Sequence, residues 1–212
     1  MKLDVLFREA EQCFSTEFGE VHNVSDGGFD RGFAQGYEDG KTFGESTALM
    51  LLERTIAEIE SNASKIEDNA LYGCKQLTSA VFPQAQLLGD NSMRDCTNLV
   101  RLEIPNATSL QGSSLRGCVK LTKVDLPKVE QLFAYVFNGC TKLDTLILRY
   151  EKLCSMSNTN ALASTPIASG TGYIYVPSTL VEGYKTASSW STYAAQIRAI
   201  EDYPDITGEG VK

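Results

Sequence analysis

The sequence is poor in the residues on which enzymes and nucleic-acid-binding proteins most depend. It contains a single histidine, His22. It has 19 Lys and Arg residues and 27 Asp and Glu residues, which gives a net charge of −8. A lone histidine without a placed nucleophile or carboxylate does not form a catalytic constellation. The acidic balance argues against binding to nucleic acid or to anionic membrane surfaces. We therefore expect no enzymatic activity and no nucleic-acid partner.

Long apolar runs and recognisable site motifs are missing as well. The longest apolar run is 48–52, far short of the ~20 residues that a membrane-spanning helix needs. Asp4, Arg8 and Glu9 stand where a signal peptide would be apolar, and neither end carries a lipidation or anchor motif. The chain has no phosphate-binding loop, nucleophile elbow or zinc-ligand spacing. We expect no membrane insertion, no signal peptide, no cofactor and no metal.

What the sequence does contain is a period of 22 residues across 62–149. Four blocks align: DNALYGCKQLTSAVFP at 68–83, DNSMRDCTNLVRLEIP at 90–105, GSSLRGCVKLTKVDLP at 112–127 and AYVFNGCTKLDTLILR at 134–149. A fixed period of this size is typical of a solenoid, because one unit cannot bury its apolar edge alone. Stacked units bury these edges against each other, so equivalent positions should form ladders. One predicted ladder consists of Leu77, Leu99, Leu121 and Leu143.

The six cysteines are compatible with a disulfide framework by number but not by position. Four of them form one column 22 residues apart: Cys74, Cys96, Cys118 and Cys140. Side chains in one column point the same way, whereas a disulfide needs convergent Cβ vectors and structural zinc needs a tetrahedron. We predict a ladder of buried free thiols and a reducing site of synthesis. Cys13 and Cys154 belong to no pattern.

The block at 134–149 carries a Phe-x-Gly-Cys turn at Phe137–Cys140, followed by Leu143, Leu146 and Leu148. This unit resembles the BspA-like leucine-rich repeats. Asp95 stands where the repeat usually has glycine, and Leu or Met replaces Phe in three units. The resemblance implies a mainly β fold with some α: a parallel leucine-rich-repeat solenoid with a helical C-terminal cap. It also implies a scaffold that binds other molecules without catalysing a reaction.

The strand of each unit ends near a proline, at Pro83, Pro105 and Pro127, because proline stops a ladder and turns the chain. Strand side chains alternate, so Leu102 and Ile104 should face the core and their neighbours the solvent. The outward positions give a candidate binding face, since exposed Arg and aromatic residues are enriched at interfaces. The candidate binding residues are Val81, Arg101, Glu103, Lys123, Asp125, Ile147, Tyr173 and Tyr175. The alternative is an ordinary solvated sheet with a lattice of charges.

Several local features follow from the repeat alignment. Positive φ angles are expected at Gly73, Asp95, Gly117 and Gly139, since Gly and Asp tolerate them. We place the solenoid at 48–177, with a strand within 49–61 or, alternatively, a short helix at 47–58. Residues 172–177 should form its last strand.

Residues 178–212 are predicted as the helical cap and tail. Ser178 is expected to cap a first helix containing Leu180, Val181 and Tyr184. A second helix is expected to hold Trp190, Tyr193, Ile197 and Ile200. Such a cap covers the open end of a solenoid, which otherwise exposes its core and a sheet edge.

Residues 1–47 form a separate N-terminal segment with short strands followed by a glycine at every fourth position. Each glycine costs about 1 kcal/mol in a helix relative to alanine, so such a helix needs a partner chain, which small residues allow to approach closely. We predict oligomerisation or docking through Gly28, Phe29, Gly32, Phe33, Gly36, Tyr37 and Gly40. The alternative is a flexible glycine-rich linker.

The stretch Phe18–Val21, followed by His and Asn, resembles the opening segment of small structural proteins of phages of Gram-positive bacteria. This implies a tail-associated protein of a phage or prophage virion, made in the bacterial cytoplasm. Its N-terminal segment would bind other virion proteins or further copies of itself, and its solenoid a protein or glycan of the host surface. The alternatives are a BspA-like adhesin at the bacterial cell surface, against which the missing signal and anchor argue, and an assembly protein without a ligand.

Overall fold

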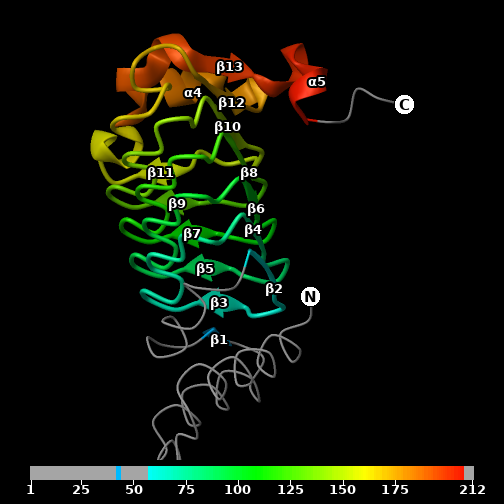
Figure 1. The fold of residues 1–212 in the computed structure, drawn as a ribbon. Coiled ribbons are helices and arrows are strands. Elements are labelled where there is room, and N and C mark those ends of the chain that lie inside the picture. Colours follow the sequence, from blue (N-terminus) through cyan, green and yellow to red (C-terminus); the bar gives the residue numbers. More distant parts are fainter. Residues whose placement is uncertain (1–41, 44–56, 208–212) are drawn as a thin grey trace, which may run out of the picture.

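The computed structural model describes residues 42–43 and 57–207, and Figure 1 shows their arrangement as a stack of similar turns. A typical turn contributes one two-residue strand and one longer strand. Both pair in parallel with their equivalents in neighbouring turns, apart from one break between the long strands β6 and β8. The leucine-rich-repeat solenoid expected from the sequence is therefore confirmed. The residues proposed for oligomerisation, from Gly28 to Gly40, lie outside the described residues.

The short strands form one sheet along the stack, and their second residue is buried from β3 to β11. In sheet order they are β1 (Thr42–Phe43), β3 (Lys65–Ile66), β5 (Leu87–Leu88), β7 (Ser109–Leu110), β9 (Gln131–Leu132) and β11 (Ser155–Met156). The register follows the 22-residue period, with Leu88 opposite Leu110 and Leu110 opposite Leu132. Strand β1 pairs with β3, so this sheet includes two residues that precede the predicted boundary at residue 48.

The longer strands lie on another side of the stack and form two sheets. The first contains β2 (Glu58–Glu60), β4 (Ser79–Val81) and β6 (Arg101–Glu103); the second contains β8 (Lys123–Leu126), β10 (Thr145–Leu148), β12 (Tyr173–Val176) and β13 (Ile197–Ala199). The ladder is interrupted between β6 and β8, and there Leu102 is only half-buried, whereas Ala80 and Val124 are fully buried. Strand β2 confirms a strand within 49–61, at Glu58–Glu60, whereas residues 47–56, where the alternative helix was placed, lie outside the described residues.

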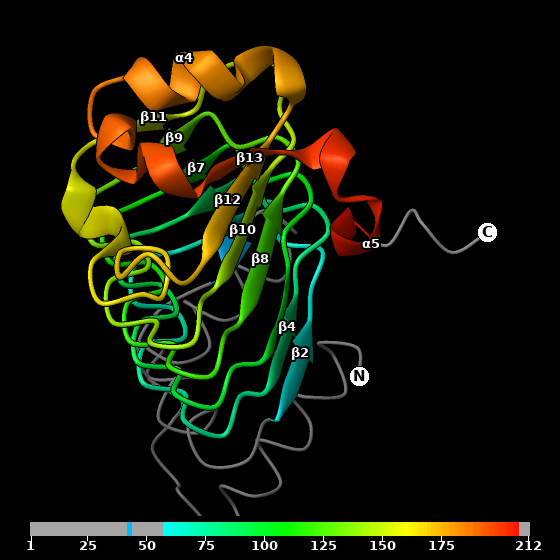
Figure 2. The ribbon, with the colours of Figure 1, turned by 90° about the horizontal axis from the view of Figure 1, so that it is seen from above.

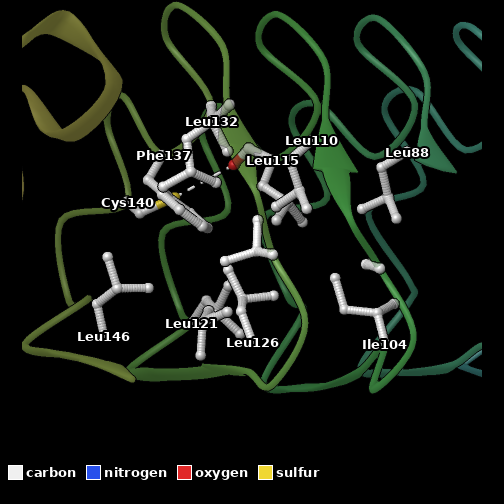
Figure 3. Packing of buried hydrophobic residues seen from close by; sticks show 14 of the residues in the cluster. Leu88, Ile104, Leu110, Leu115, Leu121, Leu126, Leu132, Phe137, Cys140 and Leu146 are labelled. Carbon is white, nitrogen blue, oxygen red and sulfur yellow. Dashed lines mark hydrogen bonds between the residues drawn. The ribbon is translucent and has the colours of Figure 1, made fainter. Parts of the chain in front are cut away.

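The core consists of the predicted ladders. Leu77, Leu99, Leu121 and Leu143 are at most 1% exposed, and Figure 3 shows Leu121 among the neighbouring apolar side chains inside the stack. Pro83 and Pro105 follow shortly after the ends of β4 and β6, as expected from the missing N–H of proline. The period therefore specified both the stacking and the inward positions.

The column of cysteines is buried, and its members are free thiols. Three of them donate a hydrogen bond to the turn before: the Sγ atoms of Cys96, Cys118 and Cys140 lie 3.0, 3.2 and 3.1 Å from the carbonyl oxygens of Leu71, Met93 and Leu115. The bond from Cys140 is drawn in Figure 3. Burial raises the pKa of Cys140 to about 12. The predicted thiol ladder is confirmed, and each of these thiols gives a carbonyl oxygen a second donor, beside the backbone N–H from which it already accepts a hydrogen bond.

Two columns of residues have a left-handed backbone. The predicted column has φ angles of 72°, 60°, 75° and 75° at Gly73, Asp95, Gly117 and Gly139. A second column, not predicted, lies four residues earlier in each turn. Its φ angles are 60°, 53°, 58° and 63° at Asn69, Asn91, Ser113 and Tyr135. Asn tolerates this conformation, whereas a bulky residue there is an outlier, so Tyr135 is the strained member.

The C-terminal cap begins with η3 (Ser178–Leu180) and α4 (Val181–Thr186), where a helix was predicted. Ser178 does not cap it through its side chain. Its backbone N–H donates instead to the Glu201 carboxylate, 3.0 Å away. The pKa of Glu201 is lowered by a hydrogen bond from its own backbone N–H and then by the one from Ser178.

The second predicted helix is present for Trp190 and Tyr193 but wrong from Ile197 on. Residues Trp190–Gln196 form the 3-10 helix η4, which is broken at Tyr193, and Ile197–Ala199 form strand β13. The unpaired edge of β12 explains the difference, since β13 pairs with it in parallel and Ile197 continues the inward column of Ile174. The chain then passes through η5 (Ile200–Asp202) to α5 (Pro204–Thr207). Every helix within the described part of the chain is too short to cross a membrane.

One inward column contains two hydroxyl groups that the described structure leaves without a partner. Its members are Ala70, Ser92, Ser114 and Val136, and the Oγ atoms of Ser92 and Ser114 are buried without a hydrogen bond. Removing an unsatisfied buried hydroxyl relieves its desolvation penalty. We therefore expect Ser92→Ala and Ser114→Ala each to raise the free energy of unfolding by about 1 kcal/mol, measured by urea denaturation. Ala70→Ser is the matched control and should lower it; a loss of stability in both alanine variants would contradict this account.

Candidate functional site

The outward side chains of the long strands form one side of the stack, which we call the strand face. Figure 2, seen from above, shows these strands lying side by side along that side. The register places Arg101 opposite Ser79 and Glu103 opposite Val81, and it aligns Asp125, Ile147 and Tyr175 in one row. The structure therefore brings the eight predicted binding residues onto one face, but it does not leave all of them exposed.

The half of the strand face made by β2, β4 and β6 is open to solvent. Arg101 and Glu103 lie on it as an ion pair, with Nη2 and Oε1 2.7 Å apart and with 59% and 50% of their side chains exposed. Beside them, Val81 is half-buried, and Glu58 and Glu60 of the first strand are exposed. An ion pair this exposed contributes at most about 1 kcal/mol to stability. Breaking it so that Arg101 or Glu103 can bind a ligand therefore costs little free energy.

The other half of the strand face is covered by residues 200–207, which we call the C-terminal strap. The ring of Tyr203 packs edge-on against Tyr175, with centroids 5.3 Å apart, and the Lys123 ammonium donates to the carbonyl oxygen of Ile206. Figures 1 and 2 show α5 beside the long strands at this end of the stack. The strap closes over a surface that alternation alone would leave exposed.

Two predicted binding residues on this half of the strand face are buried. Tyr175 is 5% exposed and Ile147, its neighbour in the register, has no exposed surface. Burial, followed by the proximity of Tyr203, raises the pKa of Tyr175. The prediction that Ile147 and Tyr175 are open to a ligand is therefore wrong in this conformation.

Most of the remaining predicted residues near the cap have partners within the chain. Arg149 donates to both oxygens of Asp125, with distances of 2.8 to 3.0 Å. Tyr173 is 38% exposed, and the Arg198 guanidinium lies 4.7 Å from its ring centroid. The sequence reasoning missed Arg149, which follows the strand, and Arg198, because β13 was read as a helix.

Two carboxylates of this face are engaged in ion pairs. Glu103 and Asp125 lie on neighbouring strands of the repeat, but each is paired with its own arginine, so they do not form an acid–base pair. Within the described residues no group of three His, Cys, Asp or Glu side chains could hold a metal ion. What the face offers a partner is a rigid surface with an exposed Arg–Glu pair beside an apolar residue.

Comparison with known proteins identifies the family of this chain. No curated protein sequence matches the chain. A crystal structure of a leucine-rich repeat protein of T. pallidum is similar, with 19% sequence identity and a TM-score of 0.45; the alignment covers 54% of this chain and 52% of that protein, about half its length. Residues 53–181 match the BspA type leucine rich repeat region in six copies. The chain therefore belongs to the BspA-type leucine-rich-repeat family, whose repeats generally serve as binding scaffolds.

Proposed function

We propose that the chain is a non-enzymatic, tail-associated component of a phage or prophage virion, and that the open half of the strand face binds a protein partner. Its repeats are of a type that generally mediates protein interactions. The observation that supports this site most is the Arg101–Glu103 pair, which stands exposed on a rigid sheet beside Val81. Arg is among the residues that contribute most binding energy at interfaces.

The partner's chemistry can be stated from the charges of this surface. Glu58, Glu60 and Glu103 are exposed on it, against one arginine, and the whole chain carries a net charge of −8. Interfaces bring complementary potentials together, so the partner should present a basic surface with an acidic group for Arg101. The sheet is fixed by parallel pairing between turns, which limits the conformational entropy lost on binding.

The virion part of the proposal is supported by the resemblance of Phe18–Val21 and by the glycine-spaced segment from Gly28 to Gly40. In this proposal residues 1–41 attach the chain to other virion proteins or to copies of itself. The test is immunogold labelling of purified particles and of intact cells from an induced culture. Labelled particles, and unlabelled ones when residues 1–41 are deleted, would support the proposal. Labelling of the cell surface alone would favour the alternative, a BspA-like adhesin.

A separate binding assay tests the strand face. Its ligand is the fraction, virion particles or cells, that retains the parent chain. We expect Glu103→Arg to weaken this binding at least tenfold, because it reverses the charge of an exposed group that faces the basic partner. Glu130→Arg is the matched control, since Glu130 is exposed but lies outside the strand face, just before β9. Equal binding by the two variants, measured by surface plasmon resonance on captured particles, would exclude the strand face as the site.

A further inference from the structure

The C-terminal strap covers part of the strand face but buries little of its own surface. Tyr175, beneath it, is 5% exposed, whereas Tyr203, whose ring lies against Tyr175, is 39% exposed. All the strap residues from Glu201 to Asp205 are exposed. Burial of apolar surface is the main favourable term when one element packs on another, and segments that bury little of it open locally at low free energy. The strap is therefore the kind of element that can leave the strand face while the solenoid stays folded.

The strap is attached to the rest of the chain at two places. Its beginning is fixed to the cap, because the Glu201 carboxylate accepts a hydrogen bond from the N–H of Ser178 at 3.0 Å. Its later part, α5 and the residue before it, lies beside the long strands (Figure 2). The N–H groups of Tyr203 and Ile206 donate within the strap, to the carbonyl oxygens of Ile200 and Tyr203. Lifting the later part would therefore leave these backbone hydrogen bonds and the attachment at Glu201 intact.

The hydrogen bond that holds the later part is one that a carboxylate can replace. Lys123 is the repeat equivalent of Arg101, which pairs with the carboxylate of Glu103. The carboxylate equivalent to Glu103 is that of Asp125, and Arg149 binds it. Lys123 donates instead to a main-chain carbonyl oxygen of the strap. An ammonium group attracts a carboxylate more strongly than a neutral carbonyl, because both members of an ion pair are charged.

The surface beneath the strap continues the open half of the strand face. Asp125 follows Glu103 by one period, and the register leads from Asp125 through Ile147 to Tyr175. The ring of Tyr173 lies 6.4 Å from that of Tyr175 and is already accessible at 38% exposure. Lifting the strap would thus add a pair of tyrosine rings to the open half, and aromatic residues are enriched in the centres of interfaces.

We propose that the strap is a displaceable cover, and that the partner bound to the open half extends its interface by taking the place of the strap. The contacts of the strap define what the partner offers there: an aromatic side chain on Tyr175, as Tyr203 provides, and a carboxylate for Lys123 in place of the Ile206 carbonyl. This inference rests on the proposed function, whose partner it describes further. The strap lowers the apparent affinity by the fraction of chains that it leaves uncovered.

Nitration of tyrosine rings by tetranitromethane measures the opening of the strap without a partner, because the reagent modifies accessible rings. The full chain is treated briefly at pH 8, and tandem mass spectrometry locates the nitro groups. We expect Tyr175 to react at least tenfold faster than Tyr184, which has no exposed surface, and at least tenfold more slowly than Tyr173. A rate equal to that of Tyr184 would mean that the strap never opens, and a rate equal to that of Tyr173 that it never covers; either would overturn the proposal.

A variant of the lysine loosens the strap without removing the ring that shields Tyr175. Lys123→Met loses the hydrogen bond to the Ile206 carbonyl, so we expect nitration of Tyr175 to become at least fivefold faster. Tyr184 should react as slowly as in the parent chain, which excludes general unfolding as the cause. Lys142→Met is the matched control, since Lys142 is exposed on another part of the chain. An unchanged rate at Tyr175 in Lys123→Met would show that this contact does not hold the strap, contrary to the proposal.

Binding to the virion particles or cells that retain the parent chain tests the competition. Tyr203→Ala should bind at least threefold more tightly in surface plasmon resonance, because its strap is easier to displace. Tyr72→Ala removes an equally exposed ring elsewhere and should bind like the parent chain. Equal or weaker binding by Tyr203→Ala would overturn the competition, whereas Glu103→Arg tests the open half separately. If neither particles nor cells retain the parent chain, the proposed function fails, and the nitration rates alone decide whether the strap opens.

Discussion

Replacing Leu121 with Asp is expected to abolish cooperative folding of the solenoid. Leu121 has no exposed surface and is the member of the ladder between Leu99 and Leu143 in the sequence. Figure 3 shows it among other buried apolar side chains. A carboxylate there would lose its water without gaining a hydrogen bond, at a free-energy cost of several kcal/mol. That is a large part of the 5–15 kcal/mol by which a typical domain is stable. Because each repeat is stabilised by its neighbours, the loss should spread along the stack.

The measurement is circular dichroism during heating, which should show no cooperative transition for Leu121→Asp. Thr122→Asp is the matched control, because it introduces the same charge one position along the chain, on an exposed side chain. It should melt like the parent chain. If Leu121→Asp also gave a normal melting curve, the ladder would not be the source of stability.

Replacing Trp190 with Ala is expected to lower the free energy of unfolding by about 3–5 kcal/mol, the range for removing a large aromatic side chain from a core. Trp190 is the chain's single tryptophan and is fully buried under the cap. Its ring packs edge-on against Tyr184, with centroids 5.2 Å apart. Its Nε1 donates to the carbonyl of Cys154 at 2.7 Å, and the N–H of Cys154 donates to the Tyr184 hydroxyl at 2.8 Å. The two rings therefore satisfy backbone groups at the end of the stack.

Urea denaturation followed by circular dichroism measures this effect. Trp190→Phe is the informative comparison, because it keeps an aromatic ring at the site and removes the hydrogen-bond donor. It should lose less stability than Trp190→Ala, by an amount that reflects the unpaired carbonyl of Cys154. An unchanged denaturation midpoint for Trp190→Ala would show that the cap does not contribute to the stability of the solenoid.

The fold could be predicted from the sequence because its interactions repeat at a fixed distance along the chain. Each buried leucine of the ladder contacts its equivalents, so the period alone identified its partners. The strand face was less predictable. Alternation tells on which side of the sheet Ile147 and Tyr175 lie, but it does not show that the strap at 200–207 returns to cover them. The contact between the strap and the strand face joins residues that are far apart in the sequence, and it does not recur with the 22-residue period.

Strand β13 and the second left-handed column were missed for different physical reasons. The spacing of Trp190, Tyr193, Ile197 and Ile200 is helical, but the edge of β12 provided unpaired backbone groups, and strand pairing prevailed over local periodicity. In the left-handed column of Asn69, Asn91, Ser113 and Tyr135, the residue type changes along the stack. The one available signal was Asn at equivalent positions in two units, since Asn favours a left-handed backbone.

The thiol ladder has a consequence for chemical durability. The thiolate is the form that oxidises, alkylates and exchanges with disulfides. Because burial raises the pKa of Cys140 to about 12, its thiol stays protonated at pH 8. The pKa values of Cys96 and Cys118 are also raised, the first chiefly by its hydrogen bond with Cys74 and the second by burial. These cysteines can thus pass from a reducing to an oxidising environment with their covalent structure intact.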